Sequence, residues 1–264
     1  MKTLDFGMPT LIETNLIEDC VKLCKELGLD FIELNMNLPQ YQIENIDIQQ
    51  LKSICEDEDI YFTIHLDENL NVCDFNNEIA NAYTKTILST IDIAKQLKIP
   101  VLNVHMSDGV YFTLPTGKVF LFDQYKDIYL TKLKKFRDTC KKAIGDSNIK
   151  ICIENCNGYK EFAMEGIELL LESNVFALTF DIGHSHSVNG IDEPFINKHI
   201  ERLHHMHAHD AKGRENHLPL GTGEIKIRER FSLAREHNCR VVLETKTIKG
   251  LKQSVEKLIN YTLE

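Results

Sequence analysis

The sequence predicts an α/β protein built as one closed (β/α)8 barrel over residues 1–264. Three observations lead to this prediction: short apolar runs rich in β-branched residues alternate with longer helical patterns, the alternation repeats eight times, and the chain has the length that eight such units need. An open doubly wound sheet is the runner-up, but no glycine-rich phosphate loop follows any of the strands. No linker rich in Gly, Ser or Pro divides the chain, so we expect a single domain.

The first four units occupy the N-terminal half of the chain. A weak strand opens it, and the helix that follows has apolar residues at helical spacing and ends at Gly28. Apolar β-type runs and helical patterns then alternate up to an insertion at 107–123, which carries four aromatic residues and which we expect to be irregular. The strands are predicted at 3–11, 31–36, 61–66 and 101–106, and the helices at 15–27, 46–55 and 77–97.

The second half continues the alternation. A basic helix follows the insertion to about Ala143, and the segment after the seventh strand is a polar loop rich in Pro and Gly. The remaining strands are predicted at 150–155, 176–181, 203–209 and 240–244, and the remaining helices at 161–171, 194–199, 225–236 and 251–259.

Charge and composition limit the partners. The net charge is -10 and the pI is near 5.6, which makes duplex DNA an improbable partner because a protein that grips nucleic acid needs a dense basic face. Residues 1–14 show no secretory leader pattern, and no apolar run is long enough to span a bilayer. We therefore expect a cytoplasmic protein that acts on a small molecule and does not bind membranes.

Metal-type donors concentrate at 204–224. In an extended strand His205, His207 and His209 share one face, and Asp210, Glu215 and His217 follow closely. Neutral imidazoles and carboxylates together suit a divalent transition metal. The alternative is a solvated polar loop after a strand that carries one satisfied core histidine.

Nearly every other predicted strand also ends in a donor. The carboxyl ends of barrel strands meet at one face, where barrel enzymes carry their chemistry. Buried carboxylates are costly without a positive partner, so their convergence favours a metal ion. Taken singly, Glu33 is as well explained by capping of the next helix, and His65 and His105 by satisfied core histidines. The donors are Glu33, His65, His105, Glu154, Asp181, His184, His207 and Glu244.

These residues lie in motifs that resemble a known family, the metal-dependent barrels that include xylose-isomerase-like sugar isomerases and epimerases and endonuclease IV. The motifs are NVHMSDG, ICIEN, FDIGHSH, HAHDAKG, NHLPLGTGEI and VLETK, each at the expected strand end. The resemblance runs over nearly the whole chain. It implies a single barrel domain, and it also implies that the chain can form a homo-oligomer.

The resemblance to the isomerases and epimerases implies one divalent ion, such as Zn, Mn, Mg or Co, bound by Glu154, Asp181, His207 and Glu244. Glu154 and Glu244 would also abstract and return a proton beside a metal-polarised carbonyl, while His184 and Arg214 would contact substrate oxygens. From the residues alone, Glu33 is a further candidate for a role in the site. Lys212 is a candidate, with Arg214, for holding a phosphate, although two basic residues in a polar loop are more often solvated.

The resemblance to endonuclease IV implies instead up to three zinc ions. Its pattern places His65 and His105 on one ion, and Glu154 bridges that ion to a second one held by Asp181, His207 and Glu244; the third would be held by His184, Glu215 and His217. In that alternative a zinc phosphodiesterase acts on abasic DNA or on a small phosphodiester metabolite. Two departures weaken it: Glu215 stands where the nuclease has Asp, and the segment from His207 to His217 is shorter.

A sugar isomerase or epimerase is therefore our first hypothesis and the phosphodiesterase is the second. A third is a barrel that binds a small molecule without turnover. Fold alone does not choose among them.

Overall fold

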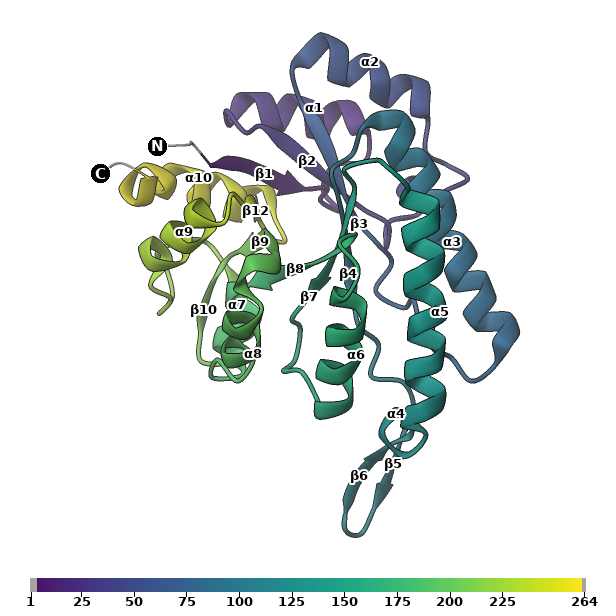
Figure 1. Cartoon of the computed structure of the whole chain (residues 1–264). Helices are drawn as coiled ribbons and strands as arrows, with labels where there is room; N and C mark the ends of the chain where they lie inside the picture. The colour runs from purple at the N-terminus through teal and green to yellow at the C-terminus, as the bar shows by residue number, and fades with distance from the viewer. Residues whose placement is uncertain (1–3, 263–264) are drawn as a thin grey trace.

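The computed structural model describes residues 4–262 and confirms the predicted fold: eight parallel strands close into one barrel, in the order β1-β12-β9-β8-β7-β4-β3-β2, with helices outside it (Figure 1). The strands are β1 (Asp5–Pro9), β2 (Phe31–Asn35), β3 (Tyr61–His65), β4 (Val101–His105), β7 (Lys150–Glu154), β8 (Phe176–Asp181), β9 (Leu203–Ala208) and β12 (Arg240–Leu243).

The helices follow the predicted alternation, with a few short additions. A six-residue helix, α7, begins at once after β8, where we expected none, because the Asp181 carboxylate accepts a hydrogen bond from the His184 amide and so caps it. The longer helices are α1 (Ile17–Glu26), α2 (Ile48–Glu58), α3 (Asn77–Leu97), α5 (Lys126–Ile144), α6 (Glu161–Leu171), α9 (Ile227–Glu236) and α10 (Ile248–Thr262). The shorter ones are α4 (Leu121–Gln124), α7 (Ile182–Ser187), α8 (Glu193–Lys198), η1 (Pro39–Tyr41) and η2 (Ile200–Arg202). No helix within 4–262 is long and apolar enough to cross a membrane.

The barrel interior is layered because alternate strand residues point inward. At the amino end, Val101, Cys152 and Ala177 form a small buried apolar cluster of their own. The fully buried Phe31, two residues before Glu33 on the same face of β2, lies at the same end of the barrel, and its ring fits because Gly7 has no side chain: a Cβ there would lie 2.4 Å from Phe31. We call these four residues the apolar plug.

Above the apolar plug the interior turns polar. Asn103 accepts a hydrogen bond from Thr179 at 2.5 Å and donates one to Glu154, and Thr63 donates to Glu33 at 2.9 Å. Each of these groups is buried, and each has a partner. The polar layer therefore connects the plug to the donor residues at the carboxyl end.

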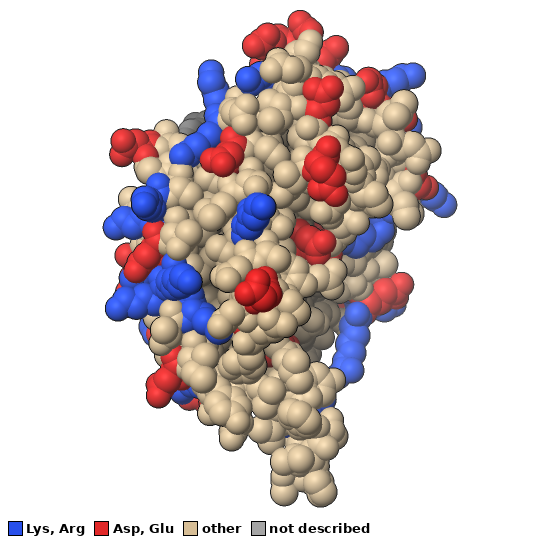
Figure 2. Space-filling model, turned by 90° about the vertical axis from the view of Figure 1, so that its right-hand side faces the viewer, with Lys and Arg blue, Asp and Glu red and all other residues tan. Residues whose placement is uncertain are grey.

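The insertion at 107–123 is not irregular, which corrects the sequence-based expectation. β5 (Tyr111–Leu114) and β6 (Gly117–Phe120) pair as an antiparallel hairpin, because aromatic and β-branched residues flank a tight Pro-Thr turn. The hairpin projects beyond the barrel (Figure 1), and its tip forms an uncharged protrusion at the bottom of the view in Figure 2. Phe122, which follows it, packs at 1% exposure and anchors its base.

The Pro/Gly-rich segment after β9 is likewise ordered, as a second hairpin of β10 (Asp210–Lys212) and β11 (Glu215–Leu218). Its organising group is the Asp210 carboxylate, which is 1% exposed. Its oxygens accept four backbone N–H bonds of 2.8 to 3.1 Å, from Ala211, Gly221, Gly223 and Ile225. The loop therefore folds around one buried charge.

Replacing that carboxylate tests how much the loop depends on it. In Asp210→Ala four buried amides lose a charged acceptor, so we expect the free energy of unfolding to fall by roughly 3 kcal/mol. Urea denaturation measures the change. Asp146→Ala, at an exposed position, is the control and should stay within about 0.5 kcal/mol of the unaltered chain. Equal stability of the two variants would contradict the role of Asp210.

Candidate metal centre

Four donors converge at the carboxyl end of the barrel. Glu154 ends β7, Asp181 ends β8, His207 lies on β9 and Glu244 follows β12. All four are buried, and one donor atom from each lies within 4.8 Å of those from the others. His207 Nδ1 is 3.2 Å from Glu244 Oε2, 3.4 Å from Glu154 Oε1 and 3.9 Å from Asp181 Oδ2. We call these residues the four-donor cluster.

The donor set fits a divalent cation. His207 Nδ1 and Glu244 Oε2 are buried atoms that have no hydrogen-bond partner among the described residues, and both face the same point. Three carboxylates and one imidazole are also the mixture of oxygen and nitrogen donors that zinc, manganese and related ions accept. Glu154, Asp181, His207 and Glu244 would hold the ion.

The charges within the cluster shift its pKa values strongly. Burial acts to lower the pKa of His207, but Glu154, Glu33 and Glu244 overcome it and hold that pKa well above the ordinary value. Burial conversely acts to raise the pKa of Glu154 and Glu244, and the facing His207 holds both well below theirs. The carboxylates therefore favour a positive charge at this point of the site.

His65 and His105 lie where the sequence predicts, beside Glu154. Their Nε2 atoms are 3.4 and 3.1 Å from Glu154 Oε2. His65 Nδ1 lies 2.8 Å from the Leu66 carbonyl, which fixes the ring proton there and leaves Nε2 free to bind. The two oxygens of Glu154 thus face different donors: Oε1 faces the four-donor cluster and Oε2 faces this histidine pair.

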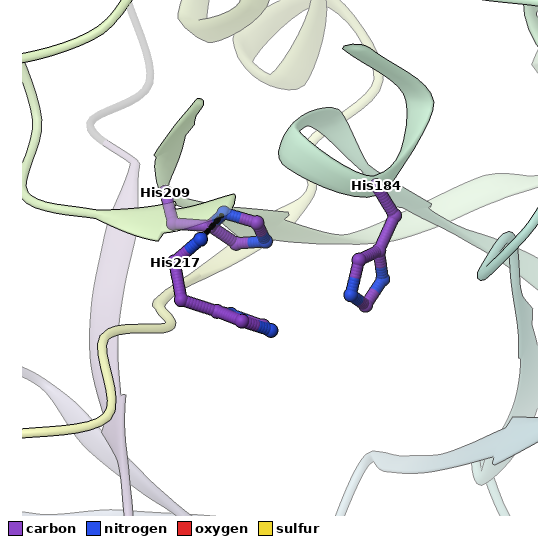
Figure 3. A group of neighbouring side chains, drawn as sticks. All are labelled: His184, His209 and His217. Atoms are coloured by element: carbon purple, nitrogen blue, oxygen red, sulfur yellow. Dashed lines mark hydrogen bonds between the residues drawn. The ribbon is translucent and has the colours of Figure 1, made fainter. Parts of the chain in front are cut away.

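The third predicted group is assembled differently from the expectation. His184 and His217 do come together, with ring centroids 5.1 Å apart, and His184 Nδ1 lies 3.2 Å from Asp181 and 3.5 Å from Glu154. Glu215 lies at the exposed start of β11, beside the hairpin turn, and belongs to no donor cluster within 4–262. The third residue near the pair is His209 (Figure 3).

Glu33 is placed below the donors. It is 1% exposed, and its carboxylate lies 2.9 Å from Nε2 of both His205 and His207. Burial acts to raise the pKa of Glu33, but the two imidazoles lower it more. This geometry suits a carboxylate that orients His207 rather than one that touches a substrate.

Lys212 and Arg214 are exposed on the second hairpin. The residues that sequence reasoning missed contact the donors directly: Lys246 Nζ lies 2.7 Å from Glu244 Oε1, and Asn103 donates to Glu154. His209 was visible in the alternation of histidines along the seventh strand, whereas Lys246 and Asn103 lack such a signal.

Comparisons with known proteins agree with this architecture. The family profile described as xylose isomerase-like TIM barrel matches residues 21–261. An uncharacterised protein of Methanocaldococcus jannaschii is 24% identical over 257 residues, 92% of each chain. Among solved structures, a D-tagatose 3-epimerase-like protein superposes with a TM-score of 0.79 at 23% identity, covering 98% of this chain and 97% of that one. IolI protein with a binding zinc atom gives 0.76 at 14% identity, covering 98% of both chains.

Metal binding should depend on pH. Glu154, Glu33 and Glu244 hold the pKa of His207 well above its ordinary value, against the opposing effect of burial. Only a deprotonated imidazole binds a metal, so the ion must displace this proton, and we expect the affinity for Mn²⁺ to rise as pH increases from about 6 to about 9. Calorimetric titration in buffers of different ionisation enthalpy measures both the affinity and the protons released. An affinity that does not change with pH would contradict this assignment.

Proposed function

The chain belongs to the xylose isomerase-like TIM-barrel family, and we propose that it is a divalent-metal-dependent isomerase or epimerase of a small sugar, keto-sugar or polyol. The observation that carries the proposal is the pairing of two buried carboxylates in one donor cluster. Glu154 and Glu244 lie 3.4 and 3.2 Å from the same nitrogen of His207. Two carboxylates beside one substrate site can serve as the proton acceptor and, once protonated, the proton donor that reversible proton transfer at carbon requires.

The surroundings of the two glutamates support this chemistry. The facing His207 holds the pKa of both well below the ordinary range, so both are ionised at neutral pH. One glutamate accepts the proton from the carbon next to the carbonyl and, now protonated, returns it to the neighbouring carbon, which isomerises the sugar. In an epimerisation the other glutamate, which has first taken a proton from solvent, protonates the same carbon from the opposite face, and the first glutamate releases its proton to solvent. When bound, a divalent ion supplies polarisation of the adjacent carbonyl and hydroxyl oxygens.

The remaining residues have supporting roles in the proposal. Asn103 and the His65–His105 pair hold Glu154, and Lys246 holds Glu244. We assign to His184, whose side chain is 16% exposed beside the cluster, the contact with a substrate oxygen. The net charge of -10 favours a small substrate over a nucleic acid.

A zinc phosphodiesterase is the second candidate, and one observation favours it. The two oxygens of Glu154 face two separate donor groups, as a carboxylate that bridges two ions would. The exposed position of Glu215 speaks against a third ion on the predicted ligands.

Metal stoichiometry separates the two candidates. We expect elemental mass spectrometry to find one ion per chain in protein purified without chelators or added metal, because one ion satisfies the four-donor cluster. Replacing both His65 and His105 by Ala should leave that count unchanged. Two or three zinc ions in the unaltered chain, with one lost in the double variant, would favour the phosphodiesterase.

The acid–base assignment is tested by proton exchange. With a screened keto-sugar substrate in D2O, Glu154→Gln and Glu244→Gln should each lower deuterium incorporation at carbon by roughly 100-fold or more, since each removes a proton acceptor. NMR measures the incorporation. Glu229→Gln, an exposed glutamate on α9, is the matched control and should exchange normally. Undiminished exchange in either site variant with an intact fold would refute the role of that glutamate. A chain that binds sugar with no exchange in any form would be a binding barrel instead.

A further inference from the structure

His209 is a buried histidine that the proposed reaction does not use. It follows β9 directly, has no exposed surface, and its Nε2 lies 3.0 Å from Oδ1 and 3.1 Å from Oδ2 of Asp181. Asp181 is one of the four proposed metal ligands, so His209 contacts a ligand of the four-donor cluster.

The backbone determines which nitrogen of His209 carries the proton. The His217 amide lies 2.8 Å from His209 Nδ1 (Figure 3), and an amide N–H can only donate. The Asp210 carbonyl is also near Nδ1, at 3.3 Å, but the shorter amide contact decides the assignment because both cannot be satisfied at once. Nδ1 is therefore an acceptor, and the ring proton sits on Nε2, where it is donated to Asp181.

With this tautomer, His209 is not available as a metal ligand together with His184 and His217. Nitrogens of His184, His209 and His217 lie within 4.8 Å of one another, the spacing of a possible three-histidine metal site. Both nitrogens of His209 are already engaged, however, one by an amide and the other by a carboxylate. A metal ion would have to break one of these bonds to bind His209.

The ring is also wedged in place. It packs directly on the backbone of α7, where a Cβ on Gly183 would lie 1.9 Å from His209 Cε1. On the other side, His217 adopts a left-handed backbone conformation (φ 56°) in the hairpin folded around Asp210. The orientation of the imidazole is therefore set by two elements that do not belong to the four-donor cluster.

We infer that His209 is a positioning residue, which holds the Asp181 carboxylate by a hydrogen bond to Oδ2, the oxygen that lies 3.9 Å from His207 Nδ1 in the four-donor cluster. Oδ1 is simultaneously held by the His184 amide at 2.6 Å. The inference rests on the proposed metal centre. Loss of such a partner of a ligand lowers metal affinity by roughly 10- to 100-fold.

Two substitutions separate the two bonds of His209. Asn offers its amide near the position of Nδ1, so His209→Asn keeps a partner for the His217 amide and loses the donor to Asp181. Gln reaches the position of Nε2, so His209→Gln keeps that donor and loses the other bond. In chelator-stripped protein titrated with Mn²⁺ and followed by electron paramagnetic resonance, we expect roughly 10- to 100-fold weaker binding for His209→Asn and near-normal binding for His209→Gln.

The alternatives give different results. Equal affinities for both variants and the unaltered chain would overturn the inference. Loss of one bound ion, with unchanged affinity at the remaining site, would also overturn it, because that result is expected if His209 is itself a ligand.

Melting of the metal-free proteins checks that both variants fold. Should His209→Asn not fold, Gly183→Ala tests the same contact by displacing the ring, and undiminished Mn²⁺ affinity there would equally overturn the inference. Because the readout is metal affinity, a chain that shows this pattern but no sugar chemistry would contradict the proposed function alone.

Discussion

Negative charge withdrawn from water is the constraint on which the carboxyl end of this barrel depends. Glu33, Glu154, Asp181, Asp210 and Glu244 are all buried, and an unpaired buried carboxylate costs several kcal/mol. The chain meets this cost in three ways. Backbone amides surround Asp210, and two imidazoles and a threonine surround Glu33. The carboxylates of Glu154, Asp181 and Glu244 converge on His207. In the last group alone the donors of three carboxylates and a histidine face one point, and this is where we propose that a cation binds.

The surroundings of these buried carboxylates are linked by shared contacts. Asp210 orders the hairpin that carries His217, the His217 amide selects the tautomer of His209, and His209 faces Asp181. Below them, the polar layer ties Glu154 to Thr179 through Asn103. The strands bring the donors to one face of the barrel, and contacts from the loops orient them there.

The fold and most donors could be predicted from the sequence because both follow local rules. Alternating apolar runs and helical patterns specify the strand count, and a carboxylate such as Glu154 at the end of an apolar run must lie at the barrel mouth. The sequence could not predict that His209, rather than Glu215, lies beside His184 and His217, because this depends on how a short hairpin turns in space. The role of Glu33 beneath His207 likewise depends on pairing between distant strands. The insertion hairpin was missed although its turn and aromatic strands carried a readable signal.

The apolar plug has a kinetic consequence. Phe31, Val101, Cys152 and Ala177 are at most 1% exposed and fill the amino end of the barrel, so a molecule can reach the donor cluster only from the carboxyl end. A molecule that reaches the cluster must leave by the route it entered. For a reaction that converts one sugar into another of equal size, departure of the product must precede arrival of the next substrate. In the proposed reaction, substrate and product therefore compete for a single entrance.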